Sequence, residues 1–142
     1  MMSSKHEYDI FLSYHRTDDE WTKRFVDALS KQGMEVWYDE IIKAGESWRE
    51  KLEEGLRQSR NIVFVVTPET ARSNWMALEL GAALALKKPL IPIVDEDTPL
   101  SDIPGPIRIR KSLAKGDPVA VAERIVRELA SERETKLEGV AQ

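Results

Sequence analysis

The chain of 142 residues contains no cysteine, and its two histidines are His6 and His15. Without cysteine there are no disulfides, no thiolate nucleophile and no cysteine-ligated metal, and two histidines argue against a zinc site. Long apolar runs are also missing, since the longest, 75–86, is too short to cross a bilayer and contains Glu79. Residues 1–7 lack the pattern of a secretory signal, so we expect a cytoplasmic protein with no membrane partner.

A strong excess of charge of one sign is absent as well. Lys and Arg total 21 against 25 Asp and Glu, and the resulting net charge of -4 argues against a dedicated nucleic-acid binder. Hydrophobic residues at 42% and charged residues at 32% are typical of one soluble globular domain. Neither a Gly-x-Gly-x-x-Gly motif nor a Walker loop occurs, which argues against a Rossmann dehydrogenase and a nucleoside triphosphatase.

Strand-like and helical segments alternate along the chain. The predicted strands are 8–14, 34–39, 61–67, 90–94 and a short fifth at 107–109. Helix starts are predicted by capping boxes at 17–20 and 47–50, by Ser73 before a helix over 74–87, and by Asp117-Pro118 before one ending near Arg133. This alternation predicts a doubly wound α/β sheet. We expect one domain over 8–133, an N-terminal arm over 1–7, and a flexible tail or the start of a linker over 134–142.

In such a sheet, ligands bind beyond the carboxyl ends of the strands. The polar residues expected at that edge are Ser13, Tyr14, His15, Arg16, Asp39, Glu40, Thr67 and Asp95–Asp97. Arg16, just past the first strand, is a candidate contact for an anionic ligand. A phospho-receiver domain has this topology too, but it needs an Asp at the end of the third strand, where this chain has Thr67-Pro68.

Glu79 is the single ionisable residue between Arg72 and Lys87. Because its helix is apolar nearly all round, we expect the helix to be mostly buried, with the carboxylate paired, protonated or at the lip of a cleft. Trp75 lies four residues earlier and therefore shares a helical face with Glu79. The pattern leaves two interpretations open, a structural ion pair with an arginine and a catalytic acid in a cleft walled by an indole.

Four motifs, in this order, resemble those of Toll/interleukin-1 receptor (TIR) domains. They are Tyr8-Asp9-Ile10-Phe11-Leu12-Ser13-Tyr14, Val36-Trp37-Tyr38-Asp39, Gly45-Glu46-Ser47-Trp48, and Ser73-Asn74-Trp75 with Glu79-Leu80. The loop after the second strand has the glycine of receptor-type domains, Gly45, but not their proline, which favours the bacterial type. The resemblance implies a flavodoxin-like five-stranded parallel sheet with helices on both faces.

The resemblance also implies an activity. Many bacterial and plant TIR domains cleave NAD at the nicotinamide–ribose bond, and the catalytic glutamate of their Trp-x-x-x-Glu segment matches Glu79 with Trp75. One carboxylate is sufficient, since nicotinamide leaves as a neutral molecule and the remaining task is to stabilise a cationic ribose. Trp75 would stack on the substrate. Capture of that cation by water gives ADP-ribose, whereas capture by the same molecule gives a cyclic isomer, and the sequence leaves both open.

The resemblance also implies roles for residues other than Glu79 and Trp75. Ser13, Tyr14 and Arg16 would contact the dinucleotide, and Asp39 and Trp48 would shape the adjoining loop. NAD is the substrate, and neither a cofactor nor a metal is implied. The resemblance implies self-association, in which the Glu40–Glu46 loop of a neighbour completes the site, and a role in bacterial immune signalling.

Two alternatives stay open on sequence alone. Some TIR domains in receptors and adaptors bind one another without catalysis, so this chain could be a silent interaction module. A nucleoside deoxyribosyltransferase-like enzyme also places a carboxylate beside a ribose on a flavodoxin-like sheet.

Overall fold

The computed structural model describes residues 6–38, 48–72 and 74–141, and within these ranges the side chains at 16, 48, 49, 74, 75 and 132–141 are not described. Five parallel strands form one sheet in the order β2-β1-β3-β4-β5. The strands are β1 (Tyr8–Ser13), β2 (Val36–Trp37), β3 (Ser59–Val66), β4 (Leu90–Val94) and β5 (Leu113–Ala114). The helices are α1 (Asp19–Lys31), α2 (Trp48–Gln58), α3 (Pro68–Ala71), α4 (Asn74–Ala85), α5 (Gly105–Arg108) and α6 (Pro118–Ala141), with the short 3-10 turns η1 (Arg16–Asp18) and η3 (Leu100–Asp102).

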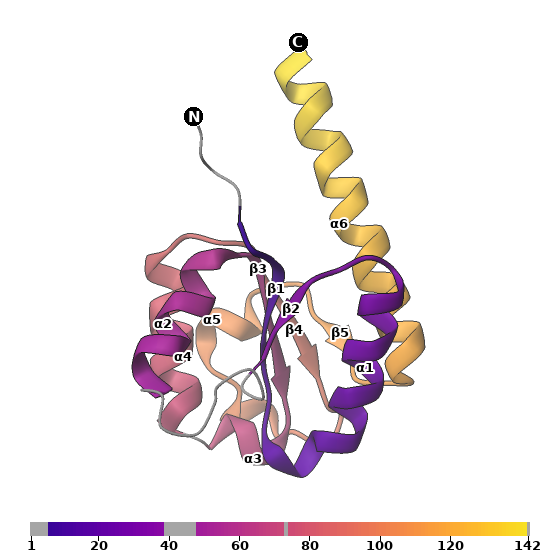
Figure 1. Cartoon of the computed structure of the whole chain (residues 1–142). Helices are drawn as coiled ribbons and strands as arrows, with labels where there is room; N and C mark the ends of the chain where they lie inside the picture. The colour runs from indigo at the N-terminus through magenta and orange to yellow at the C-terminus, as the bar shows by residue number, and fades with distance from the viewer. Residues whose placement is uncertain (1–5, 39–47, 73, 142) are drawn as a thin grey trace.

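Helices cover both sides of the sheet, as the sequence predicts (Figure 1). Alternate residues of the two central strands point to opposite sides. One side, the α1/α6 core, comprises Ile10, Leu12, Val63 and Val65 with Phe25, Leu29, Val121, Ala122 and Ile125 and their neighbours. The other side, the α2/α4 core, comprises Phe11, Ile62, Phe64 and Val66 with Leu52, Leu56, Met76, Leu80 and Ala83 and their neighbours. The almost unbroken apolar run of β3 is therefore explained by burial on both faces.

The prolines of β4 predict a position near the edge of the sheet, and β4 lies next to the edge strand β5. Pro92 pairs in register with Phe64 of β3, whereas β5 pairs only with the following residues, Ile93 and Val94. The missing N–H of Pro92 therefore interrupts no pairing with β5.

The predicted fifth strand at 107–109 is wrong. Ile107 lies in the short helix α5, and the fifth strand is formed by Leu113–Ala114. Pro106 stands in the first turn of α5, where its fixed backbone angle favours a helix. Ile107 is buried at 1% exposure within α5, whereas Ile109 follows the helix and is 83% exposed, so the two do not alternate as in a strand.

Three helices also depart from the predictions at their ends. Helix α1 starts at Asp19, and its N-cap Asp18 makes no side-chain capping bond, so the predicted Thr17 capping box does not form. Helix α4 ends at Ala85, before the expected Lys87. The backbone of α6 continues to Ala141, past the end expected near Arg133 and through the segment expected as a tail. The capping box at 47–50 begins at a residue outside the described ranges.

Helix α4 is also less buried than its composition predicts. Met76, Glu79, Leu80 and Ala83 face the protein, but Leu78 on the outer side is 47% exposed. An apolar helix need not be enclosed on every side, because surface area on a small domain exceeds what polar residues can cover.

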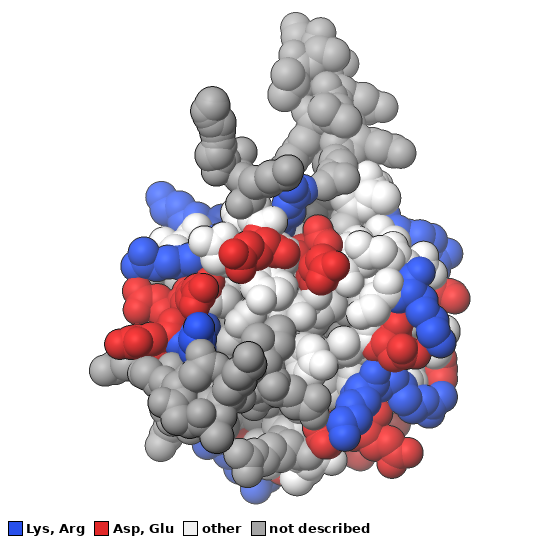
Figure 2. All heavy atoms as spheres, viewed as in Figure 1, with Lys and Arg blue, Asp and Glu red and all other residues white. Residues whose placement is uncertain are grey.

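The outer surface of α2 carries charges of both signs. Glu50, Glu53 and Glu54 line it together with Arg57, which lies 2.7 Å from Glu53 as an i,i+4 ion pair. On the face shown in Figure 2, blue and red side chains are likewise interspersed. Such exposed pairs contribute little to stability, typically less than about 1 kcal/mol each.

Lys88 ties the carboxyl end of α2 to the strand that follows it. Its ammonium group donates to the carbonyl oxygens of Leu56, Arg57 and Ser59 at 2.5–2.7 Å. The carbonyls of Leu56 and Arg57 are among those that the end of α2 leaves without an intrahelical partner, and Ser59 is the first residue of β3. Burial lowers the pKa of Lys88 below its ordinary value. Lys88 thus caps the carboxyl end of α2 where the chain enters β3, on the side of the sheet where the strands begin.

Two glycines in helices offer a matched test of packing. A Cβ on Gly55 would lie 2.6 Å from Trp37, whose ring is stacked on Phe11 at 4.8 Å and so cannot easily move, whereas a Cβ on Gly81 would meet nothing within 4 Å. We expect Gly55→Ala to destabilise the protein by about 2 kcal/mol through overpacking. We expect Gly81→Ala to stabilise it by up to about 1 kcal/mol. Urea unfolding measures both, and equal effects would contradict the packing described for Trp37.

Within the described residues, no helix combines the length and the apolar character that crossing a membrane requires. The same part of the chain holds no cluster of three or more His, Cys, Asp or Glu side chains arranged to hold a metal ion.

Candidate functional site

The topology creates a switch point between the carboxyl ends of β1 and β3. After β1 the chain passes to α1 on one side of the sheet, and after β3 it passes to α3 and α4 on the other side (Figure 1). Loops that diverge in this way leave a crevice, which is where doubly wound folds bind ligands. The segments beside it are residues 14–18 after β1 and Thr67–Ala71 after β3.

Glu79 is buried, with 7% of its surface exposed, in the first half of α4. Met76, Leu80 and Ala83 belong to the α2/α4 core and hold this face of the helix against the sheet. Helix α4 follows β3 after only the short helix α3, so its N-terminal half starts near the switch point. A carboxylate buried in such surroundings is held in a poorly hydrated environment, where its charge acts strongly on a nearby cation.

The other sequence-predicted residues occupy different places. Ser13 ends β1 and is buried, and Tyr14 packs against the α1/α6 core, on the side of the sheet opposite α4. Arg16 opens η1, Trp48 is the first residue of α2 and Trp75 is the second of α4, so all three are placed by their backbone only. Asp39 and the Glu40–Glu46 loop lie outside the described residues.

Hydroxyl groups secure the end of β3. The Thr67 hydroxyl accepts the backbone N–H of Thr70 at 3.2 Å and contacts the Thr70 hydroxyl at 2.8 Å. The Thr98 hydroxyl donates to the carbonyl of Val66 at 3.3 Å. These bonds satisfy buried polar groups and turn the chain sharply into α3. The segment that leads from the central strand to α4 is thereby fixed.

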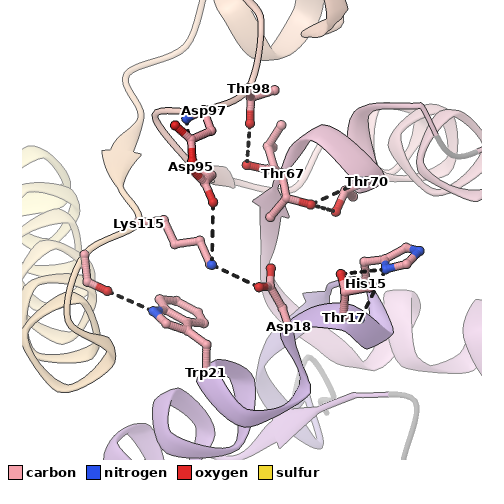
Figure 3. Close-up of polar contacts among 12 residues, drawn as sticks. His15, Thr17, Asp18, Trp21, Thr67, Thr70, Asp95, Asp97, Thr98 and Lys115 are labelled. Carbon is pink, nitrogen blue, oxygen red and sulfur yellow. Dashed lines mark hydrogen bonds and ion pairs between the residues drawn. The ribbon is translucent and has the colours of Figure 1, made fainter.

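The structure also contains a charged cluster, beside the carboxyl ends of the strands, that the sequence did not predict. Lys115, after β5, lies 3.0 Å from an oxygen of Asp18 and 3.7 Å from an oxygen of Asp95, with its ammonium 5.2 Å from the centre of the Trp21 ring (Figure 3). The side chains of Lys115 and Asp18 are only 12% and 15% exposed. Trp21 itself donates its ring N–H to the carbonyl of Gly116 at 2.8 Å. This Lys115 cluster joins the loops that follow β1, β4 and β5.

No sequence signal identified the Lys115 cluster, because its members lie far apart along the chain. Lys115 follows the true fifth strand, which the prediction had placed at 107–109. The sequence already places Asp95 at the carboxyl end of β4, and a fifth strand at Leu113–Ala114 places Lys115 at the carboxyl end of the neighbouring strand.

His15 makes two short contacts with the residue two positions later. Its Nδ1 accepts the backbone N–H of Thr17 at 3.2 Å and lies 3.0 Å from the Thr17 hydroxyl. The imidazole therefore stabilises the turn that leads into η1, as an Asn or Asp side chain does in an Asx turn.

Comparison with known proteins decides the family. Residues 10–126 match the family described as "TIR domain", and this span is most of the chain. The chain belongs to the TIR-domain family. The family expected from the four sequence motifs is thus confirmed.

Bacterial and archaeal TIR proteins are among its relatives. The chain is 35% identical over 81 residues to BtTIR of Bacteroides thetaiotaomicron, a 2′ cyclic ADP-D-ribose synthase, a match that covers 56% of this chain and 28% of that protein. It is 30% identical over 98 residues to the NAD(+) hydrolase TcpA of a Theionarchaea archaeon, covering 65% of this chain and 30% of that protein. The TIR domain described here therefore matches less than a third of either relative.

Solved structures show the same fold. The TIR domain of the Toll-related receptor TRR-2 from Hydra magnipapillata superposes with a TM-score of 0.69 at 20% identity, covering 88% of this chain and 97% of that one. A metazoan TIR-STING receptor from C. gigas gives a TM-score of 0.69 at 21% identity, covering 86% of this chain and 42% of the receptor. The flavodoxin-like fold expected from the sequence is confirmed.

Proposed function

We propose that this TIR domain cleaves the nicotinamide–ribose bond of NAD and that Glu79 is its catalytic carboxylate. The observation that carries the proposal is the burial of Glu79, at 7% exposure, in the half of α4 nearest the switch point. Relatives named as an NAD(+) hydrolase and as a 2′ cyclic ADP-D-ribose synthase support the substrate.

The chemistry requires little beyond a fixed negative charge. The bond between the ribose C1′ and the nicotinamide nitrogen breaks, and its electron pair neutralises the positive pyridinium ring. Glu79 stabilises the cationic ribose that remains and accepts a hydrogen bond from a ribose hydroxyl. Water attacking C1′ gives ADP-ribose and a proton, whereas a hydroxyl of the same ADP-ribosyl group gives a cyclic isomer. The names of several relatives favour the cyclic product.

The remaining site residues belong to the same proposal. Trp75 stacks on the substrate, Ser13, Tyr14 and Arg16 contact the dinucleotide, and Asp39 and Trp48 shape the adjoining loop. Because Ser13 is 8% exposed and Tyr14 packs on the α1/α6 core, these two residues contact the dinucleotide only through the atoms that they leave exposed. The Glu40–Glu46 loop of a neighbouring copy completes the site. Such an enzyme in the cytoplasm would consume NAD or make a cyclic signal, which fits bacterial immune signalling.

Incubation of the purified protein with NAD tests this function. We expect release of nicotinamide, with a rate per protein molecule that rises with protein concentration, because a second copy completes the site. Chromatography separates nicotinamide, ADP-ribose and its cyclic isomers. An absence of nicotinamide at every concentration would contradict the proposal and favour a silent interaction module. Exchange of bases between deoxynucleosides would instead favour a deoxyribosyltransferase-like enzyme.

A further inference from the structure

The loop that follows β4 holds the end of β3 through two hydrogen bonds. The carbonyl of Val66, the last residue of β3, accepts the backbone N–H of Asp95 at 2.8 Å and the hydroxyl of Thr98 at 3.3 Å. Thr98 also donates its backbone N–H to the carbonyl of Asp95 at 3.0 Å, which closes the loop as a turn. The next residue after Val66 is Thr67, the N-cap of α3. The direction in which the chain leaves β3 therefore depends on the loop after β4.

Asp95 connects this loop to Lys115. One oxygen of its carboxylate, Oδ1, accepts the backbone N–H of Asp97 at 2.9 Å, and the other, Oδ2, lies 3.7 Å from the Lys115 ammonium. Figure 3 shows Lys115 between the carboxylates of Asp95 and Asp18. Because the Lys115 side chain is only 12% exposed, solvent screens its charge little. Lys115 therefore fixes the orientation of the Asp95 carboxylate and, with it, the loop after β4.

The Lys115 ammonium thus has two branches, which lead to opposite sides of the sheet. The Asp18 branch ends at the N-cap of α1, a helix of the α1/α6 core. The Asp95 branch ends at the last residue of β3, from which the chain continues through α3 to α4. Helix α4 carries Glu79. Only the Asp95 branch therefore leads along the chain to the proposed catalytic carboxylate.

We propose that Lys115 is a positioning residue for NAD cleavage, which acts through Asp95 on the start of α4 and hence on Glu79. This inference rests on the function proposed above. A displacement of about 1 Å caused by a distant substitution can lower a reaction rate about a hundredfold. Looser attachment of α4 would reduce the time that Glu79 spends beside the ribose, but it would remove no group that binds NAD. The loss should therefore appear in kcat rather than in KM.

Three substitutions separate the two branches. Lys115→Met removes the cation from both. Asp95→Asn keeps an oxygen that can accept the Asp97 N–H and removes the charge from the Asp95 branch alone. Asp18→Asn is the matched control, because its ion pair is the shorter and less exposed one, at 3.0 Å against 3.7 Å and with 15% against 26% of the carboxylate side chain exposed. We compare kcat and KM for nicotinamide release at a temperature at which circular dichroism shows each variant to be folded.

We expect Lys115→Met and Asp95→Asn each to lower kcat about tenfold and to keep KM within about threefold of wild type. Asp18→Asn should keep kcat within about threefold, although it removes the closer ion pair. A wild-type kcat in folded Lys115→Met, or a rise in KM in place of the loss of kcat, would overturn the positioning role. An equal loss of kcat in Asp18→Asn and Asp95→Asn would overturn the route through Asp95.

Amide hydrogen exchange provides a measurement that does not depend on activity. The amides of α3 and α4 should exchange about threefold faster or more in Lys115→Met and Asp95→Asn, and near the wild-type rate in Asp18→Asn. If the wild-type protein releases no nicotinamide but exchange follows this order, the proposed function is contradicted and the coupling of Lys115 to α4 is supported. If nicotinamide is released but these amides exchange equally in all variants, the function is supported and the inference is overturned.

Discussion

Replacing Glu79 with glutamine is expected to reduce NAD cleavage by about a thousandfold or more while leaving the fold intact. The amide has nearly the same shape as the carboxylate but carries no charge, so it cannot stabilise the cationic ribose. Loss of one well-placed electrostatic group typically lowers kcat by a factor of about 10² to 10³, and here it is the central one. The measurement is nicotinamide release at saturating NAD, because the effect should be on kcat.

The control is Glu123→Gln, which neutralises an exposed carboxylate on α6. It should retain wild-type turnover and unfolding temperature. Circular dichroism and thermal unfolding show whether Glu79→Gln is folded. Turnover that persists in a folded Glu79→Gln variant would show that Glu79 is not catalytic. Its burial would then be explained by the alternative named above, a structural ion pair.

Replacing Lys115 with methionine is expected to destabilise the protein by about 2–3 kcal/mol. Methionine keeps most of the volume, but the carboxylates of Asp18 and Asp95 lose the cation that lies 3.0 and 3.7 Å from their oxygens. One Asp18 oxygen, Oδ2, is already buried without a hydrogen bond in the described part of the chain, so this charge has little other compensation. Removal of one partner from such a buried pair is strongly destabilising. Thermal unfolding should show a decrease in Tm of about 8 °C.

Lys31→Met provides the matched control. Lys31 also lies 3.0 Å from a carboxylate, that of Asp27, but the two side chains are 77% and 65% exposed. Solvent screens this pair, so its loss should cost less than about 0.5 kcal/mol. Equal destabilisation by the two substitutions would show that burial of the Lys115 cluster does not strengthen it. In the double variant with Asp18→Asn, we expect much of the loss to be recovered.

The sheet was predictable because its signals are local. The apolar run of β3 and the segments of β1 and β4 each carry their own pattern, and parallel order follows from the helices between them. The fifth strand could not be predicted, because β5 is two residues long and pairs only with Ile93 and Val94. So short a strand is defined by its neighbour, whereas the stronger local pattern of Ile107 and Ile109 belongs to α5 and the turn that ends it.

The candidate site was predictable in part for the same reason. Glu79 stands out because it is the single charge in an apolar helix, and its burial agrees with that pattern. The Lys115 cluster and the bond from Thr17 to His15 could not be foreseen. Each depends on how loops from different strands, or a turn and a side chain, meet after the sheet has formed. The start of α1 could not be predicted for the same reason. The 3-10 turn η1 precedes the helix, so the capping box predicted from Thr17 does not form.

A crystal structure of the Glu79→Gln variant with NAD would test the central claim most directly. We expect the nicotinamide ribose to lie against the N-terminal half of α4, with a ribose hydroxyl within hydrogen-bond distance of the side chain at position 79. Density for the dinucleotide elsewhere, with that side chain enclosed by the core and no space for a ribose beside it, would contradict a catalytic role for Glu79.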